Sequence, residues 1–338
     1  MSSYSICHWN TGLSPTALDT PLKDFEELTE KQRQKLAKLK ARFEQKKTYI
    51  DLFLDYVLVQ KNFDLIFLSE VSSKDISYFR STISTFELDY LVIDGTFPTD
   101  STRFDSCCIY KPSSFISILD KPESFITDDG NFNFNIALKY SFIPSHIFSE
   151  SDLESKYYVD NVIDFYMCHW ASKISTSGEE KRKLVSQNLH YHIRSCTQRN
   201  FIILGDFNAN PYEYPIYENL KGIRCKETVI RHGKNDANIL YLYNPSWKFL
   251  WFHQDTYDEG LDSNKTNPLG TYYFSTNSAE RWNVFDQVLV PYTLLNQKFK
   301  WNFDCNSLKI IHLDLISARP WRKANFDHLP FHFQITER

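Results

Sequence analysis

The stretch Phe201–Pro211, FIILGDFNANP, is the part of the sequence that decides the fold. Its four apolar residues have the length of a short buried strand, and Gly205-Asp206 ends that strand in a turn. A helical pattern over Glu179–Arg194 precedes it, and an apolar run over Val162–Cys168 precedes the helix. Strand, helix and strand in this order are typical of a crossover unit between parallel strands. The sequence therefore predicts an α/β fold around this stretch.

Other apolar runs of the chain also end at, or lie beside, a carboxylate or an imidazole. These groups are Glu70, His169, Asp286 and the pair Asp327-His328, and an amide, Asn10, follows the first apolar strand. A buried strand that ends in such a group points it into a crevice shared with its neighbours. Five segments of this kind favour an active site over a coincidence.

The composition fits a single soluble globular domain. The chain has 338 residues, 42% hydrophobic and 24% charged, and no Gly/Ser-rich or Pro-rich linker divides it, so we expect a single domain over residues 1–338. The net charge of −4 gives no overall attraction to nucleic acid, and any site for a polyanion must be built locally. Seven scattered cysteines without a CxxC spacing predict reduced core thiols and no structural zinc site.

The start of the chain does not have the pattern of a secretion signal, because no basic region followed by an apolar one is present. No run reaches the roughly 18 apolar residues that are needed to span a bilayer. We therefore expect a cytoplasmic protein without a membrane span.

A basic helical segment follows the first strand. From about residue 24 to residue 60 apolar residues recur at three- and four-residue steps, without an internal Gly or Pro. Between Thr29 and Lys47 there are eight basic residues and two acidic ones. A solvated helix face is the more common explanation of such a pattern, and a positive arm that contacts phosphates is the alternative.

The side chains at the strand ends favour a hard divalent cation. They provide carboxylates, an amide and imidazoles but no thiolate: Glu70, Asp206, Asn208, Asp286, Asp327, His169 and His328. Hard oxygen ligands favour Mg²⁺ or Mn²⁺ over zinc. Such an ion, with a base and an imidazole nearby, suits the attack of water on a phosphate ester.

These segments resemble the metal-dependent endonuclease/exonuclease/phosphatase superfamily, which includes deoxyribonucleases, abasic-site endonucleases, deadenylases, neutral sphingomyelinases and inositol polyphosphate 5-phosphatases. The resemblance runs from Asn10 to Pro330, and Gly205–Asn208 and Asp327–Pro330 are its most specific parts. It implies a four-layer α/β/β/α sandwich, in which two mixed β-sheets pack face to face with helices outside, the DNase I-like fold. The basic helical segment at about 13–60 would then be an insertion.

The resemblance also implies a role for each residue. Glu70 would bind the metal, and Asn10 and Asp327 would help to position that ion or a second one. Asp206 and Asn208 would hold the attacking water and a phosphate oxygen.

The two histidines would act on the phosphate and on the leaving group. His328 would hydrogen-bond the scissile phosphate and be kept protonated by Asp286, since a neighbouring carboxylate raises the pKa of an imidazole. His169 matches the second histidine of the deoxyribonuclease and sphingomyelinase branches, which contacts phosphate or protonates the leaving oxygen. Asp94 is a candidate for the carboxylate partner of His169.

Some positions depart from the superfamily. Phe326 stands where a serine is common, and Asn131–Asn135 offers no cation where deoxyribonucleases carry an arginine that contacts the DNA backbone. Trp282–Asp286 lacks the Cys-Asp-Arg pattern that is typical of inositol phosphatases.

The leading functional hypothesis is a Mg²⁺-dependent phosphodiesterase that hydrolyses nucleic acid, DNA rather than RNA, as an endonuclease. One alternative is a phosphatase or phosphodiesterase acting on a small or lipid-linked phosphate ester, and another is a nuclease of a toxin or defence system that a regulatory protein partner restrains. A third is a scaffold protein that keeps the fold without catalysis. The aromatic segments Tyr241–Trp247 and Phe249–Phe252 fit core packing better than the stacking of unpaired bases.

Overall fold

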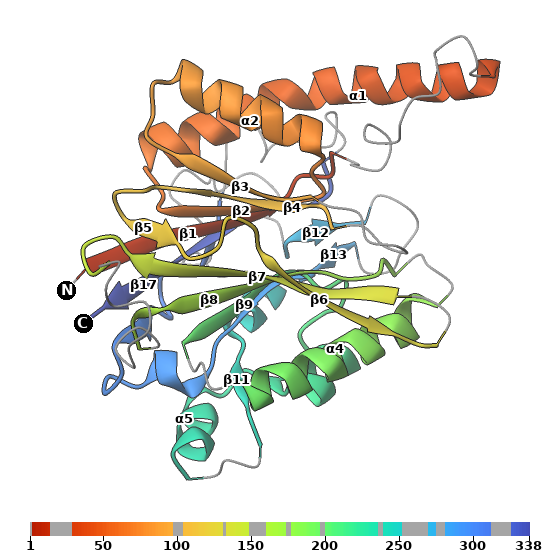
Figure 1. The fold of residues 1–338 in the computed structure, drawn as a ribbon. Helices are drawn as coiled ribbons and strands as arrows, with labels where there is room; N and C mark the ends of the chain where they lie inside the picture. Colours follow the sequence, from red (N-terminus) through yellow and green to blue (C-terminus); the bar gives the residue numbers. More distant parts are fainter. Residues whose placement is uncertain are drawn as a thin grey trace.

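The computed structural model describes residues 2–13, 29–96, 104–130, 133–148, 160–173, 177–196, 200–235, 239–251, 270–274, 281–311 and 326–338. Within these residues two mixed β-sheets lie face to face, and helices cover their outer faces (Figure 1). The four-layer α/β/β/α sandwich that the sequence predicts is therefore confirmed.

The first sheet has the strand order β15-β17-β1-β2-β4-β3, and β16 also pairs with β17. Its strands are β1 Ser2–Asn10, β2 Leu65–Ser69, β3 Leu91–Gly95, β4 Ser106–Tyr110, β15 Trp301–Phe303, β16 Lys309–Ile310 and β17 Phe331–Glu337. β1 and β2 are parallel, whereas β17 is antiparallel to β1 and β4 is antiparallel to β2. The carboxyl ends of β1 and β2 thus lie at the same edge of the sheet as the amino ends of β4 and β17.

The second sheet has the order β14-β9-β8-β7-β5, and β6 also pairs with β7. Its strands are β5 Phe115–Ser117, β6 Glu123–Asp128, β7 Asn133–Pro144, β8 Ile163–His169, β9 Phe201–Asp206 and β14 Asp286–Leu289. β8 and β9 are parallel, as the crossover pattern predicts, and His169 pairs with Asp206. β14 runs antiparallel to β9 and begins at Asp286, opposite Asp206.

Helices cover the outer face of each sheet. α1 Glu30–Leu54, which continues as the π-helical turn η3 Asp55–Gln60, and α2 Ser73–Thr85 lie outside the first sheet, and α4 Gly178–Ser195 and α5 Lys226–Asn235 lie beyond the second (Figure 1). The smaller elements are η5 Pro215–Asn219, η6 Pro245–Leu250, η8 Tyr292–Leu295, β10 Gly222–Ile223, β11 Leu242–Tyr243, β12 Tyr272–Tyr273 and β13 Trp282–Asn283. Among the described residues no helix is both long and apolar enough to cross a membrane.

Capping boxes begin two of these helices. Thr29 and Gln32 exchange hydrogen bonds at the start of α1, and Ser72 and Asp75 do so at the start of α2. Each box satisfies amide groups that the first helical turn leaves open. α1 therefore begins after Thr29, and residues 24–28 of the predicted helix lie outside the described residues.

The core between the sheets is aromatic. The Phe67 ring on β2 lies 5.1 Å from the Phe165 ring on β8, and both side chains are fully buried. Of the seven cysteines, Cys7, Cys107, Cys108 and Cys168 are buried and none forms a disulfide. The predicted reduced core thiols are thus found at these four positions.

The strand predictions differ from the structure mainly at the edges of the second sheet. β6 has no apolar run, since its residues alternate between exposed and half-buried positions. An edge strand with one solvated face gives such a weak signal. β7 is also much longer than the apolar run Ile136–Leu138 within it, because its first half pairs with β6.

Candidate active site

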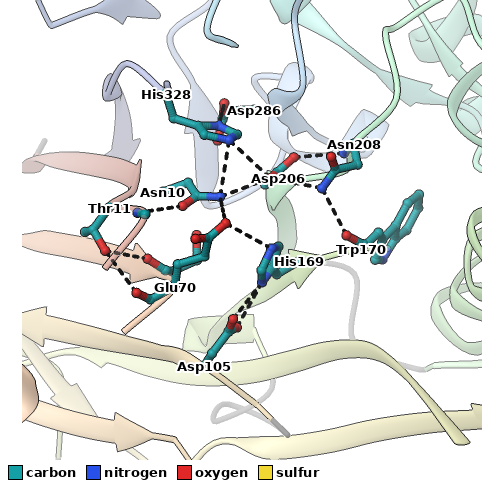
Figure 2. A network of polar contacts seen from close by, with 12 residues as sticks. Asn10, Thr11, Glu70, Asp105, His169, Trp170, Asp206, Asn208, Asp286 and His328 are labelled. Carbon is teal, nitrogen blue, oxygen red and sulfur yellow. Dashed lines mark hydrogen bonds and ion pairs between the residues drawn. The ribbon is translucent and has the colours of Figure 1, made fainter. Parts of the chain in front are cut away.

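The strand topology brings the polar strand ends of both sheets together. Two groups of three side chains have ligand atoms within 4.8 Å of one another, Glu70 with His169 and Asp206, and Asp206 with Asp286 and His328. Asp206 is common to both groups and is 1% exposed. Figure 2 shows the network that links these residues to Asn10 and Asn208.

His328 and Asp286 form a buried imidazole–carboxylate pair. Nδ1 of His328 lies 2.8 Å from Oδ2 of Asp286, and its Nε2 lies 3.7 Å from Oδ2 of Asp206. Burial alone would lower the pKa of His328, but Asp286, then Asp206 and Asp327, outweigh burial and raise this pKa well above the ordinary value. The imidazolium is thus the stable form of His328 at neutral pH, and its Nε2–H faces the centre of the site.

Asp206 is held by a tight turn. The amide of Asn208 donates to Oδ1 of Asp206 over 2.8 Å, and Nδ2 of Asn208 donates to Oδ2 over 3.1 Å and to the Trp170 carbonyl over 3.0 Å. Burial raises the pKa of Asp206, and the negative charge of Asp286 adds to this effect while the positive charge of His328 opposes it. Asn208 has φ 49°, a left-handed conformation that asparagine tolerates better than most residues.

The glycine of the GDFN motif is required by the close approach of two strands. Gly205 has φ 134°, and a Cβ there would lie 2.0 Å from the carbonyl oxygen of Cys168 on β8. Only a residue without a side chain allows β9 to pair with β8 at this point. Gly205 therefore sets the position of Asp206 relative to His169.

Asn10 connects the two sheets. Its Nδ2 donates over 3.0 Å to Oε1 of Glu70 and over 3.0 Å to Oδ2 of Asp206, and lies 3.5 Å from Nε2 of His328. Its Oδ1 accepts from the Gly12 amide. Asn10 thus holds two carboxylates together through its NH₂ group, and its predicted role toward a metal stays a prediction.

Glu70 and Asp327 lie on the same side of the site. Glu70 has φ 55° directly after β2, and its Oε1 lies 3.7 Å from Nε2 of His169. Asp327 is half-buried, and its Oδ1 lies 3.6 Å from the point where a Cβ of Gly12 would be, while Oε2 of Glu70 lies 4.0 Å from that point. All eight residues that the sequence singled out are therefore brought to one place.

The carboxylate partner of His169 is Asp105 and not Asp94. Nδ1 of His169 lies 2.9 Å from Oδ2 of Asp105, whereas Oδ1 of Asp94 accepts from the amide and the hydroxyl of Thr96. Burial lowers the pKa of His169, but Asp105, Glu70 and Asp206 outweigh burial and raise it to about 10. Asp105 immediately precedes β4, and it lies near Glu70 because β4 is antiparallel to β2, which ends beside Glu70.

Two further residues of the site were missed from the sequence. His8 on β1 is fully buried, and its Nδ1 lies 3.8 Å from Oδ1 of Asp286. Burial, and then the charges of His328 and His169, lower the pKa of His8 to about 3, so this imidazole stays neutral. Tyr272 lies with its ring 4.6 Å from that of His328 and stacks on Phe285 at 4.8 Å.

A cleft of about 440 Å³ opens beside Glu70 and His169. Its walls come from β4, β7, β8 and α4: Glu70, Asp105, Phe134, Asn135, His169, Trp170, Ala171, Ser172, Lys181 and Val185. Nζ of Lys181 lies 5.2 Å from the centre of the Phe134 ring. Lys181 on α4 thus places a cation beside Phe134. The segment Asn131–Asn135, to which Phe134 belongs, has no basic residue of its own.

The donor set fits a hard divalent ion. Carboxylate oxygens of Glu70 and Asp206 lie within 4.8 Å of each other, and Asp327 lies on the same side of the site as Glu70. Oxygen-rich sites of this kind suit Mg²⁺ or Mn²⁺. The described residues thus provide a candidate site for one such ion.

The fold is the one found in solved endonuclease/exonuclease/phosphatase structures, so the resemblance read from the motifs is confirmed at the level of the fold. No protein-family model and no curated protein matches the sequence. Solved structures match over nearly the whole chain. TDP2 of D. rerio, complexed with a single-strand DNA product, is 15% identical with a TM-score of 0.53 over 99% of this chain and 100% of that one.

Bacterial proteins match equally well. The endonuclease/exonuclease/phosphatase of Bacteroides vulgatus is 11% identical with a TM-score of 0.55 over 100% of both chains. A conserved protein of unknown function from Enterococcus faecalis V583 is 11% identical with a TM-score of 0.56 over 99% of this chain and 100% of that one. At these identities the likeness defines the fold, and the function must be argued from the site.

Proposed function

We propose that this protein is a Mg²⁺- or Mn²⁺-dependent phosphodiesterase that hydrolyses nucleic acid, with DNA as the preferred substrate and internal bonds as the point of attack. The observation that carries the proposal is the convergence of two imidazole–carboxylate pairs, His328–Asp286 and His169–Asp105, on Asp206. Each pair presents an Nε2 to the same small space, one from each side. Two proton-bearing groups around one reacting centre suit in-line displacement at phosphorus.

The described residues divide the work of the reaction. A bound divalent ion, held by Glu70 with help from Asn10 and Asp327, would supply a Lewis acid for a phosphate oxygen. Asp206, with its raised pKa, is placed to orient and deprotonate the attacking water, and Asn208 fixes the Asp206 carboxylate. Water and phosphate are thereby aligned before the reaction begins.

The two histidines act on opposite sides of the phosphate. His328 donates from Nε2 to an oxygen of the phosphate, where negative charge increases in the transition state, and Asp286 keeps the imidazole protonated. His169 has its Nδ1 bound to Asp105, so its Nε2 carries the proton that the leaving oxygen needs. Raised pKa values make both imidazoles charged at neutral pH.

The cleft favours a polymeric substrate over a small phosphate ester. It extends from His169 to Phe134 and Lys181, which together offer an aromatic face and a cation to a nucleotide beyond the scissile phosphate. TDP2, whose fold is similar, is solved with a single-strand DNA product. Both observations support nucleic acid, and DNA in particular.

The test is cleavage of supercoiled plasmid and of a labelled RNA with Mg²⁺ or Mn²⁺, and with EDTA. We expect nicking of the plasmid that EDTA abolishes and that His328→Ala lowers at least about 100-fold. His146→Ala is the matched control, because this histidine is 57% exposed and forms an ion pair with Glu337, outside the candidate site. Nicking that persists in His328→Ala would refute the assignment.

A small phosphate ester distinguishes the alternative function, a phosphatase, from a nuclease. Hydrolysis of p-nitrophenyl phosphate without cleavage of either polymer would make the protein a phosphatase. A cytoplasmic location and control by a partner protein stay predictions. Inactivity of the purified chain that a binding partner from the same cells relieves would support the regulated nuclease.

A further inference from the structure

One lysine of the basic helix is turned into the protein. The side chain of Lys46 on α1 is 1% exposed, whereas Lys31 and Lys38 of the same helix are exposed. Its ammonium donates to the carbonyl oxygens of Gly12 and Thr11, over 3.4 Å in the second case, and lies 4.9 Å from the centre of the Phe326 ring. A buried lysine is rare because its charge loses hydration, and it needs compensating negative groups.

The carboxylates of the proposed metal site lie close to this ammonium. The point where a Cβ of Gly12 would be is 2.9 Å from Nζ of Lys46, 3.6 Å from Oδ1 of Asp327 and 4.0 Å from Oε2 of Glu70. One cation and two carboxylates thus surround a single small volume. Gly12 leaves this volume open, since it has no side chain and has φ 57°.

We propose that Lys46 is a positioning residue that supplies a fixed positive charge beside Glu70 and Asp327, so that the site holds one divalent ion instead of two. The inference rests on the proposed function, because it assumes that these carboxylates bind the ion. Two metal ions in a phosphodiesterase lie about 4 Å apart and share their carboxylates. An ammonium in that neighbourhood offsets the same negative charge and repels a second ion.

Lys46 also holds the backbone that carries Asn10. It binds the carbonyl groups of Thr11 and Gly12, and the Gly12 amide donates to Oδ1 of Asn10 over 3.0 Å. This contact turns the NH₂ group of Asn10 toward Glu70 and Asp206. The basic helix is therefore joined to the catalytic centre through one residue, independently of any contact between its exposed lysines and a substrate.

The sign of the effect on metal binding tests the inference. In the metal-free protein, titrated with Mn²⁺ and followed by the electron paramagnetic resonance signal of the free ion, we expect one site per chain. Lys46→Met keeps an unbranched apolar side chain but removes the ammonium. This variant should bind Mn²⁺ about tenfold more tightly or bind a second ion, while kcat falls because Asn10 is less well held. Lys46→Arg should keep one site with the affinity of the parent.

Lys47→Met is the matched control. This neighbouring lysine lies 5.0 Å from the ring of Tyr78 and away from the carboxylates, so its loss should leave Mn²⁺ binding and kcat unchanged. If Lys46→Met does not fold, Gly12→Ala decides, because a Cβ at Gly12 must displace the ammonium and should also tighten Mn²⁺ binding. Unchanged or weaker Mn²⁺ binding in a folded Lys46→Met would overturn the inference. A parent protein that binds no Mn²⁺ would instead overturn the proposed function.

Discussion

Replacing Asp105 with asparagine should lower the pKa of His169 by roughly 2–3 units, from about 10 to about 7–8. The Nδ1–Oδ2 distance of 2.9 Å places the two charge centres roughly 4–5 Å apart. At an effective dielectric constant of about 20 such a pair gains about 3–4 kcal/mol. His169 is 26% exposed and Asp105 18%, so solvent screening reduces this energy only in part. The asparagine keeps the shape of the side chain and removes its charge.

The assay is a histidine NMR titration of the metal-free protein, with the His169 resonance assigned by loss of the signal in His169→Gln. Asp94→Asn is the control, because Asp94 bonds Thr96 and has no contact with His169 among the interactions of the described residues. We expect no change in the pKa of His169 in this control. A shift of less than one unit in Asp105→Asn, or an equal shift in Asp94→Asn, would refute the electrostatic account of this pair.

Three other predictions follow from the fold and the cleft. Gly205→Ala should lower the free energy of unfolding by at least about 3 kcal/mol in urea denaturation, because its Cβ would meet the Cys168 carbonyl. Gly130→Ala has open space around its Cβ and should lower the free energy of unfolding by only about 1 kcal/mol. Equal losses in the two variants would contradict the argument from the close approach of the strands. The pKa of His8 is lowered to about 3, so its contribution to stability is complete above the pKa of the unfolded chain near 6.5 and is lost as the pH falls. The loss of stability between pH 7 and pH 5 should therefore be about 2 kcal/mol smaller in His8→Phe than in the parent. Parallel pH profiles of the two proteins would contradict a lowered pKa of His8. Lys181→Met should raise KM for DNA several-fold without changing kcat, and an equal effect on p-nitrophenyl phosphate would assign Lys181 to the fold instead.

Much of the site can be predicted from the sequence, because several of its residues end buried strands. Asp206 and His169 are marked by apolar runs that stop at a polar group, whereas Asp286 begins a strand. The four layers were implied by the resemblance to the superfamily, and the alternating strand and helix signals agree with them. Periodicity and turn chemistry are local signals, and they are strong in these strands.

The missed residues depend on contacts that local patterns do not encode. Asp105 precedes a strand instead of following one, and its partner is fixed only when β4 pairs with β2. In the sequence His8 is an ordinary strand residue, and Lys46 is one of many lysines in a helix. Only tertiary packing distinguishes them from their neighbours. Asp94 was the wrong choice for His169 because β3 and β4 are antiparallel, which leaves Asp94 opposite Cys107 instead of beside Glu70.

Three of the short contacts at the centre join a residue of one sheet to a residue of the other. His328 and Asp286, Asp105 and His169, and Asn10 and Asp206 all pair across the gap between the sheets. A chain in which only one of the two sheets had formed would lack one partner of each of these three pairs. The proposed hydrolysis would therefore require both sheets to be docked on each other. The Phe67 and Phe165 rings pack on each other in the core between the sheets. This packing therefore helps to fix the distance between the site residues of one sheet and those of the other.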